Sequence, residues 1–534
     1  MFKKLIDKAR NIFSKDDKDS NKTQERIPIS SDIDKVHKKV KELFGKSDDV
    51  TIREFVIGNS SVKALIVMID GMIDKKIINR DVLQPLMVQS RGVPPGEDEI
   101  SDMYDWVNER VLTFQSVKES DDFKGSIDAV LSGDTVLFID GYDQSLIISA
   151  RGWDERGVQR PTTEKVIRGP KESFTETLRT NTSLIRRKIK NTNLKFESMV
   201  IGSVSRTQVS IGYIEGIVNP KIVKEVKTRL KDIEVDAILD TGYIQEYIED
   251  APLSPLPTIH RTERPDGVAG KLLEGKVTIL VDGSPSALTV PTIFVEYLSI
   301  SEDYYQRASF STFTRWLRIV AFFTTLLLPA FYVAIVSFHQ EMLPTQLIIS
   351  IAAEREGVPF PSVVEAILMG LLFEILREAG TRMPRPIGQA VSIVGALILG
   401  EAAVTAGLTS TPMVIVAALT GVGVFVIPSA DLAFTLIPLR FLLTILSAIL
   451  GMFGILLGLL MITIHMASLR SFGIPYLSPL APGTYRDLKD VLVRAPWWAM
   501  NTRPNLYTEN QIRQEVNQKP QDPEDDEKEL KHSD

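Results

Sequence analysis

The chain contains 534 residues with a formal net charge of −7, and none of them is cysteine. At about 150 residues per domain, this length predicts three or four folded units. The missing cysteines exclude disulfide bonds, cysteine zinc sites and thiol nucleophiles. The negative charge argues against a nucleic-acid partner, because a protein that binds phosphate backbones needs a basic face.

Residues 1–27 are predicted to form an amphipathic and flexible N-terminal arm. In Met1–Phe13, apolar side chains fall on one helical face and basic side chains on the other, which is typical of a helix lying on a membrane surface. A frayed, solvated arm is the alternative. The segment lacks the continuous apolar core of a secretory signal. The polar residues Ser14–Arg26 that follow predict a flexible linker.

Residues 28–155 and 156–300 are predicted to form two α/β subdomains of a water-soluble head, because short apolar runs alternate there with helical patterns. The first subdomain should end in a hairpin around Asp140-Gly141, since glycine accepts the positive φ of such turns. The expected strands are Thr51–Ile57, Val62–Ile69, Thr135–Ile139 and Ser145–Ser149, and the expected helix is Lys75–Ser90.

The second subdomain follows the glycine- and proline-rich segment Arg151–Lys165, which is interpreted as a link. It contains a second hairpin, around Asp282-Gly283. This likeness hints at two related subdomains, but we attribute it to a shared turn type. The expected helices are Lys171–Asn191 and Pro220–Asp232, the strands Ser198–Val204, Gln208–Gly216, Lys276–Val281 and Ala287–Val290, and Ala251–Gly267 should be an extended loop.

The sequence carries no recognisable catalytic or metal-binding motif. A P-loop, a G-x-S-x-G elbow and an H-E-x-x-H motif are absent, and the five histidines are too scattered to give metal-ligand spacing. Asp70, Asp140 and Asp282 each precede a glycine, and turn chemistry accounts for them. We therefore predict no catalytic, cofactor-binding or metal-binding residues, and we expect that the protein is not an enzyme.

Residues 301–470 are predicted to form an α-helical integral membrane domain. Four apolar stretches meet or approach the about 20 residues that a helix needs to cross a bilayer. They are Ile319–Phe338, Ile387–Leu408, Pro412–Pro428 and Phe441–Met466. A further run, Val363–Leu376, is too short to span comfortably and predicts a re-entrant or interfacial helix.

Basic residues at the two ends of this domain predict its orientation. Arg315 and Arg318 precede the first span and several basic residues between 470 and 494 follow the last, so the head and residues 471–508 should be cytoplasmic. That requires an even number of crossings, and four is preferred. Five crossings would place Arg377, Arg382 and Arg385 on the cytoplasmic side, as the rule requires, but would put the basic C-terminal segment outside. Residues 509–534 are acidic and predict a disordered tail.

Ionisable side chains within the apolar region are candidates for function, because a charge in a bilayer is costly. Glu365, Glu374 and Arg377 lie in or beside the short run, and Glu401 lies in the second span. Glu374 and Arg377 are three residues apart, so a plain ion pair on a helix surface is the alternative interpretation of these two.

Small residues between 391 and 428 permit close approach of helices in a membrane. Gly421, Gly423 and Pro428 are therefore candidates for a pore lining that gates by excluding water. Helix packing within one subunit explains the same residues equally well.

Several long motifs resemble the A subunits of GerA-type spore germination receptors. They include FHQEMLPTQLIISIAAEREGVPFPSVVEA (Phe338–Ala366), FEILREAGTRMPRPIGQAVSIVGALILGEAAVTAGLTSTPMVIVAALTG (Phe373–Gly421), SFGIPYLSPLAPG (Ser471–Gly483) and, in the head, RGPKESFTETLRTNTSLIRRKI (Arg168–Ile189). The resemblance covers the chain from about residue 50 to about residue 505. The motifs add His339, Gln340, Glu341, Pro344, Arg382 and Pro384 as candidate functional residues.

The resemblance implies a non-enzymatic subunit of a nutrient-sensing complex in the inner membrane of a bacterial endospore. Such A subunits act with a transporter-like B subunit and a lipoprotein C subunit, and are expected to form homo-oligomeric, ligand-gated ion channels surrounded by membrane lipid. A paralogous protein, encoded with dipicolinate-channel genes and amplifying the germination signal, is an alternative. From the residues alone, the second functional hypothesis is a stand-alone secondary transporter, and the third is a membrane-anchored enzyme.

Overall fold

The computed structural model describes residues 26–91, 103–111, 117–152, 161, 164, 166–382, 395, 398–483, 487–509 and 512–513. Residues 1–25 of the predicted arm and most of the predicted acidic tail lie outside these residues. The chain divides into two compact units, Met1–Glu42 with Val50–Gly152 and Leu43–Asp49 with Trp153–Asp534. The second unit contains one α/β subdomain together with the apolar helices.

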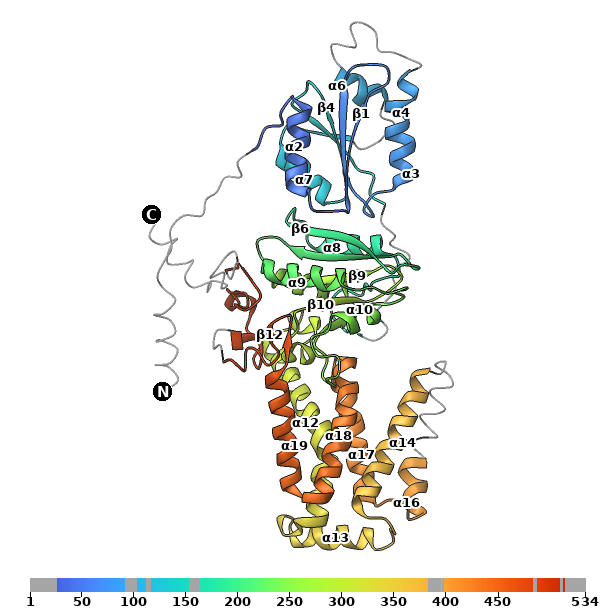
Figure 1. The fold of residues 1–534 in the computed structure, drawn as a ribbon, viewed down its shortest axis with the longest axis vertical. Coiled ribbons are helices and arrows are strands. Elements are labelled where there is room, and N and C mark those ends of the chain that lie inside the picture. The colour runs from blue at the N-terminus through green and yellow to red at the C-terminus, as the bar shows by residue number, and fades with distance from the viewer. Residues whose placement is uncertain are drawn as a thin grey trace, which may run out of the picture. The chain divides into compact units, whose positions relative to one another are not determined.

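The α/β subdomain of the first unit is a five-stranded antiparallel sheet with the order β1-β2-β4-β5-β3 and helices on both faces (Figure 1). Every residue of β4 is buried, as expected of a strand covered on both sides. The predicted helix Lys75–Ser90 forms as two short helices joined by a π-helical turn. The elements are α2 (Ile33–Phe44), β1 (Val50–Val56), β2 (Lys63–Ile69), α3 (Lys75–Ile78), η1 (Asn79–Leu83), α4 (Gln84–Met87), η2 (Gln89–Arg91), α6 (Met103–Trp106), η3 (Val107–Val111), β3 (Val117–Ser120), α7 (Phe123–Leu131), β4 (Thr135–Ile139) and β5 (Ser145–Ile148).

The α/β subdomain of the second unit repeats this plan, with a five-stranded antiparallel sheet in the order β6-β7-β9-β10-β8. α8 and α11 pack on one face of the sheet, over Phe196 and Leu280, and α9 and α10 pack on the other, over Ile211 and Ile279. The elements are α8 (Leu178–Lys188), β6 (Leu194–Ile201), β7 (Thr207–Ile214), α9 (Pro220–Lys231), α10 (Thr241–Ile248), β8 (His260–Thr262), α11 (Pro265–Leu273), β9 (Val277–Val281) and β10 (Ala287–Val290).

The two Asp-Gly turns have the same role in the two subdomains. Asp140 accepts a hydrogen bond from the amide of Ile33, at 3.2 Å, and Asp282 accepts one from the amide of Leu178, at 3.0 Å. Each aspartate thereby caps the first helix of its own subdomain. The likeness between the subdomains therefore extends beyond a shared turn type, because the sheet order and the long-range cap are also repeated.

Two expectations for the second subdomain are wrong in part. Ala251–Gly267 is not one extended loop, since it contains β8 and the first turn of α11. The helix expected at Lys171–Asn191 begins seven residues later, as α8. The residues before α8 make tertiary contacts instead: the amide of Phe174 donates to the carbonyl oxygen of Glu263 at 2.9 Å.

Apolar helices follow two 3-10 turns, η4 (Phe294–Leu298) and η5 (Ser301–Tyr304). Among the described residues, two helices are long and apolar enough to cross a membrane: α12 (Ala308–Phe338) and α18 (Ala430–Leu450). Two shorter helices, α17 (Thr411–Val426) and α19 (Met452–Ser468), are also apolar. The remaining elements are η6 (Gln340–Met342), α13 (Thr345–Arg355), α14 (Ser362–Arg382), η7 (Ile398–Ala402) and α16 (Ala403–Thr405).

The predicted single span Phe441–Met466 is wrong. Gly451 adopts φ 61° and ψ −139°, a conformation that L-residues avoid, and the chain reverses there between α18 and α19. A continuous apolar run gives no sign of this break, because both arms of the hairpin are apolar. The helix expected at Val363–Leu376 is also longer than predicted, because α14 extends to Arg382 and has 21 residues. Residues 387–394, 396 and 397 of the predicted span Ile387–Leu408 lie outside the described residues.

The segment after α19 returns to the second α/β subdomain. The amide of Glu509 donates to the carbonyl oxygen of Ile217 at 2.8 Å, and the side chains of Phe472 and Tyr507 enter the core beneath α9. This C-terminal segment contains β11 (Arg470–Ser471), β12 (Ile474–Pro475), η8 (Asp487–Asp490) and η9 (Trp497–Ala499). The subdomain, the helices and the C-terminal segment are thus packed into one unit.

Candidate functional site

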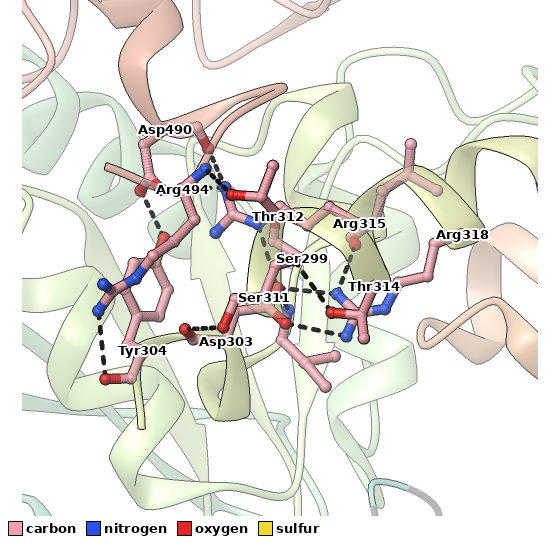
Figure 2. A network of polar contacts seen from close by, with 12 residues as sticks. Ser299, Asp303, Tyr304, Ser311, Thr312, Thr314, Arg315, Arg318, Asp490 and Arg494 are labelled. Carbon is pink, nitrogen blue, oxygen red and sulfur yellow. Dashed lines mark hydrogen bonds and ion pairs between the residues drawn. The ribbon is translucent and has the colours of Figure 1, made fainter. Parts of the chain in front are cut away.

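A buried ion-pair network lies where α12 meets the head. Arg315 and Arg318 are one helical turn apart on α12, so their side chains share a face. Both reach Asp303 of η5: Arg315 Nε lies 3.2 Å and Arg318 Nη1 2.7 Å from its Oδ2, and Arg318 Nη2 lies 2.9 Å from its Oδ1 (Figure 2). The side chains of Arg315 and Asp303 are each 2% exposed. The two arginines are therefore paired within the protein, although the sequence suggested only a role in orientation.

The C-terminal segment joins the same network. Arg315 Nη1 lies 2.9 Å from Asp490 Oδ1, and the Tyr304 hydroxyl donates to Asp490 Oδ2 at 2.5 Å. Burial raises the pKa of Tyr304 well above its usual value, so its hydroxyl stays protonated and can donate. The backbone amide of Arg494 donates to Thr312 Oγ1 of α12 at 3.2 Å. We call Asp303, Tyr304, Arg315, Arg318, Asp490 and Arg494 the head–membrane joint.

A second charged cluster lies between α14 and α18. Arg377 Nε lies 2.7 Å from Glu374 Oε2, and Arg440 Nη2 of α18 lies 3.0 Å from Glu374 Oε1. The exposed fraction of the side chain is 13% for Arg377, 14% for Glu374 and 4% for Arg440. The i+3 ion pair that the sequence indicated does form, but it also holds two helices together. Sequence reasoning missed Arg440 because the predicted span began at Phe441; the apolar residues on both sides of Arg440 were the available signal.

Glu365 caps the start of α17. Its side chain is fully buried, and its Oε2 accepts hydrogen bonds from the amide and the hydroxyl of Ser410, at 2.9 and 2.8 Å. Arg355 Nε, at the end of α13, lies 3.3 Å from Oε1 of the same carboxylate. Carboxylates are favourable at helix N-termini. Glu365 thus fastens α14 to α13 and α17, which is a structural role not specified by the sequence.

Glu401 differs from the other acids because it is exposed in the single chain. It lies in η7, where its backbone oxygen accepts a hydrogen bond from Thr405 Oγ1 at 2.8 Å. The structure therefore does not bring Glu401 together with Glu365 or with the Glu374 cluster.

The two candidate glycines of α17 are points of close approach within the chain. A Cβ at Gly421 would come within 2.4 Å of the Phe373 ring of α14, and one at Gly423 within 2.4 Å of Thr325 Oγ1 of α12. Pro428 lies in the turn between α17 and α18. These contacts favour helix packing as the role of both glycines.

The candidates taken from family motifs fall in two places. His339, Gln340, Glu341 and Pro344 lie around the end of α12 and the η6 turn, and Gly451 packs there, since a Cβ on it would lie 2.7 Å from His339 Cε1. Arg382 ends α14, exposed and paired with Glu378, its Nε 2.6 Å from Glu378 Oε1. Pro384 lies outside the described residues.

The described part of the chain contains no group of three or more histidine, aspartate or glutamate side chains placed to hold a metal ion. The charged clusters consist of arginines in contact with carboxylates. These clusters offer no nucleophile with an adjacent base.

Comparison with known proteins gives a consistent family. Residues 38–506 match the family described as Bacillus/Clostridium GerA spore germination protein. Spore germination protein KA of Bacillus subtilis (strain 168) is 45% identical over 93% of this chain and 90% of its own length. Stage V sporulation protein AF of the same organism is 31% identical over 89% of this chain and 94% of its own length.

Among solved structures, the N-terminal domain of the A subunit of the Bacillus megaterium spore germinant receptor GerK3 matches 51% of this chain and 99% of its own length, at 36% identity and a TM-score of 0.39. The family match covers most of the sequence, and the identity to KA extends over nearly all of it. The resemblance seen in the sequence motifs is thereby confirmed: the chain belongs to the GerA family of spore germination proteins.

Proposed function

We propose that this protein is the A subunit of a nutrient germinant receptor in the spore inner membrane, and that it couples germinant sensing to ion release. The head–membrane joint carries this proposal. Asp303 and Asp490, on two segments beside the head, both hold Arg315 in the first turns of α12. A displacement of either segment therefore acts directly on a membrane helix. Coupling of this kind requires such an element shared by both parts.

Six membrane crossings fit the packing of the helices. α18 starts near the head, where Thr435 Oγ1 donates to the carbonyl oxygen of Pro255 at 2.6 Å, and α19 ends there, with His465 Nε2 2.8 Å from Ser254 Oγ. The hairpin at Gly451 lies at the other end, against the close of α12. α14 and α17 cross as well, and because α17 starts beside Glu365 near the start of α14, one further crossing between Arg382 and Ser410 makes the proposed number even.

Six crossings keep the head and the C-terminal segment on one side, in the cytoplasm facing the spore core. They also resolve a conflict in the charge pattern. α14 runs from α13 at the far end back toward the head (Figure 1), so Arg377 and Arg382 come to the cytoplasmic half, as the positive-inside rule requires. Four crossings would leave both arginines on the opposite side.

The proposed partners are a transporter-like B subunit, a lipoprotein C subunit and further copies of this chain. Glu401 supports assembly into an ion channel. An ionised carboxylate against hydrocarbon costs about 2.5–3.5 kcal/mol at the centre of a helix. Because Glu401 is exposed in the single chain, it faces water or another subunit in the assembled protein.

The amplifying paralogue is the alternative function. The identity of 45% to KA, against 31% to Stage V sporulation protein AF, favours the receptor subunit. Deletion of the gene separates the two: loss of a receptor subunit abolishes the response to its own nutrients and leaves other responses intact. Slower germination with every nutrient would instead identify the amplifier.

Arg315→Gln tests the coupling role. It removes the link between α12 and Asp490 but leaves Arg318 paired with Asp303. We expect normal protein level and subunit association, with nutrient-triggered ion release slowed by on the order of tenfold, as for a typical coupling energy. Arg53→Gln, an exposed change on β1, is the control. Wild-type ion release in Arg315→Gln spores would refute the coupling role.

A further inference from the structure

Arg494 is a buried cation without a matching anion. It is 4% exposed, yet within the described parts of the chain no carboxylate lies within ion-pair distance of its guanidinium. Nη2 makes one long hydrogen bond, 3.4 Å, to the carbonyl oxygen of Tyr304, and Nε is buried with no acceptor. Buried charges in proteins are normally paired. The side chain therefore lacks an anionic partner.

The neighbouring Arg315 shows the same deficit. Its Nη2 is also buried without an acceptor among the described residues, although its other nitrogens bind Asp303 and Asp490. In the joint, three arginines face two aspartates (Figure 2). One positive charge is left over, and N–H groups from two guanidinium planes remain unused.

Exposed aromatic and apolar side chains surround this excess charge. Trp316 lies one turn before the apolar run of α12, and its indole donates to the carbonyl oxygen of Leu492 at 3.0 Å. The Arg494 guanidinium carbon lies 5.5 Å from the centroid of the Trp497 ring. The indole N–H of Trp497 donates to the Tyr304 carbonyl oxygen at 3.2 Å. The exposed members are Phe310, Phe313, Trp316, Leu492, Val493 and Trp497.

Tryptophans of this kind mark the level of lipid headgroups. The unused donors thus lie at the depth where phosphate groups are found in a membrane. An arginine presents a planar set of N–H groups that matches phosphate geometry. A free phosphate ion would satisfy the charge, but it gives no reason for the exposed apolar side chains around the site.

We propose that Arg494, with Trp497 over it, binds the phosphate group of an anionic phospholipid in the leaflet next to the head. The acyl chains lie along the exposed face of α12 at Phe313 and Trp316. The lipid completes the charge balance of the joint and ties the C-terminal segment to the membrane. Trp497 moves aside to admit the headgroup.

The test uses the full chain purified in detergent and then placed in nanodiscs of phosphatidylcholine, with or without phosphatidylglycerol. Native mass spectrometry counts retained phosphatidylglycerol, and thermal unfolding records stabilisation. Arg494→Gln should reduce retention by on the order of tenfold, the effect of losing one charge-assisted contact. Arg470→Gln, an exposed change at the same end of the helices, is the control for general charge attraction.

The lipid proposal holds if phosphatidylglycerol stabilises the wild type and Arg470→Gln but not Arg494→Gln, with Arg494→Lys in between because the planar donor set is lost. It is refuted if Arg470→Gln and Arg494→Gln lower retention equally. It is also refuted if inorganic phosphate alone gives the full thermal stabilisation. The same holds if the stabilisation accompanies self-association of the chain and does not depend on phosphatidylglycerol. Should Arg494→Gln not fold, the comparison of Arg494→Lys and Trp497→Leu with the wild type decides.

Discussion

Arg440 changes how Glu374 and Arg377 should be interpreted. Spacing alone predicted a pair on one helix, and that pair forms with Arg377 Nε 2.7 Å from Glu374 Oε2. The third member comes from α18, 66 positions further along the chain, and only the fold brings it to 3.0 Å. One carboxylate thus contacts two guanidinium groups between two apolar helices, which leaves a formal charge of +1 on the cluster.

The stability of this cluster should depend on which charge is removed. Glu374→Gln leaves two buried arginines facing each other, whereas Arg440→Gln leaves a neutral Glu374–Arg377 pair. We expect Glu374→Gln to cost about 3–5 kcal/mol, the usual effect of an uncompensated buried charge, and Arg440→Gln to cost clearly less. Thermal unfolding of the full chain in detergent measures both, and equal losses would contradict this charge count.

Lys271 gives the head a pH-dependent stability. Its Nζ lies 3.4 Å from Glu296 and 3.2 Å from Thr289 Oγ1, and burial lowers its pKa from 10.5 to about 8. Between these pH values the unfolded chain carries the proton and the folded chain does not. The free energy of unfolding therefore rises with pH in this window, by at most about 1.4 kcal/mol per unit.

Lys271→Met isolates this contribution. The variant lacks the group, so the wild type should gain stability relative to it as the pH rises from 8 to 10. Denaturant unfolding of both proteins at each pH gives the difference, in which contributions from other titrating groups cancel. If the difference in unfolding free energy between wild type and variant were constant or fell with pH, the pKa of Lys271 would not be lowered in the folded protein.

At the scale of elements, the hairpin at Gly451 is the largest departure from the sequence prediction. The length of the apolar run predicted one span across Phe441–Met466, and nothing in the composition marked an interruption. The reversal depends on one residue with φ 61°, followed by Gly454 and Gly458, where a Cβ would meet α18 within 2.3 Å. Glycine spacing was the only available signal, and in membrane helices it usually indicates packing instead.

Gly451→Ala should therefore destabilise the helical bundle. The new Cβ requires a strained conformation and would lie 2.7 Å from His339 Cε1. A residue forced into such a region costs about 1–3 kcal/mol. Thermal unfolding in detergent records the loss.

Gly380→Ala in α14 is the matched control, since no atom lies within 4 Å of its new Cβ. It should be neutral or slightly stabilising, because alanine favours helix. If both variants lost the same stability, the special conformation of Gly451 would not be the cause.

At the scale of the whole molecule, the exposed Glu401 and the head–membrane joint indicate what the isolated chain lacks. Glu401 needs a polar environment that the described residues do not supply, and Arg494 needs an anion. The proposed assembly in a membrane would meet both requirements, with other subunits around the helices and lipid headgroups around the joint.

Glu401→Gln distinguishes the environments of that residue. If Glu401 faces an aqueous ion pathway, as proposed, the variant should reach normal protein level in spores but release ions several-fold more slowly after nutrient addition, because the pathway loses a charge. Immunoblotting and ion-release measurements check both. Glu356→Gln, an exposed change after α13, serves as control. Unchanged release, or a more stable protein, would place Glu401 against a plain packing surface or lipid.

The sequence by itself determined the family and most strands and helices of the two α/β subdomains. These follow from local pattern: alternation in the strands, Asp-Gly in the turns, and long motifs shared with relatives. It also identified Glu374 with Arg377, because three residues are one helical turn. Only the tertiary structure decided where α18 reverses, which residues complete each ion cluster, and that Arg315 and Arg318 are paired inside the protein. Those features depend on side chains up to 175 positions apart, such as Arg315 and Asp490, and no local pattern encodes such distances.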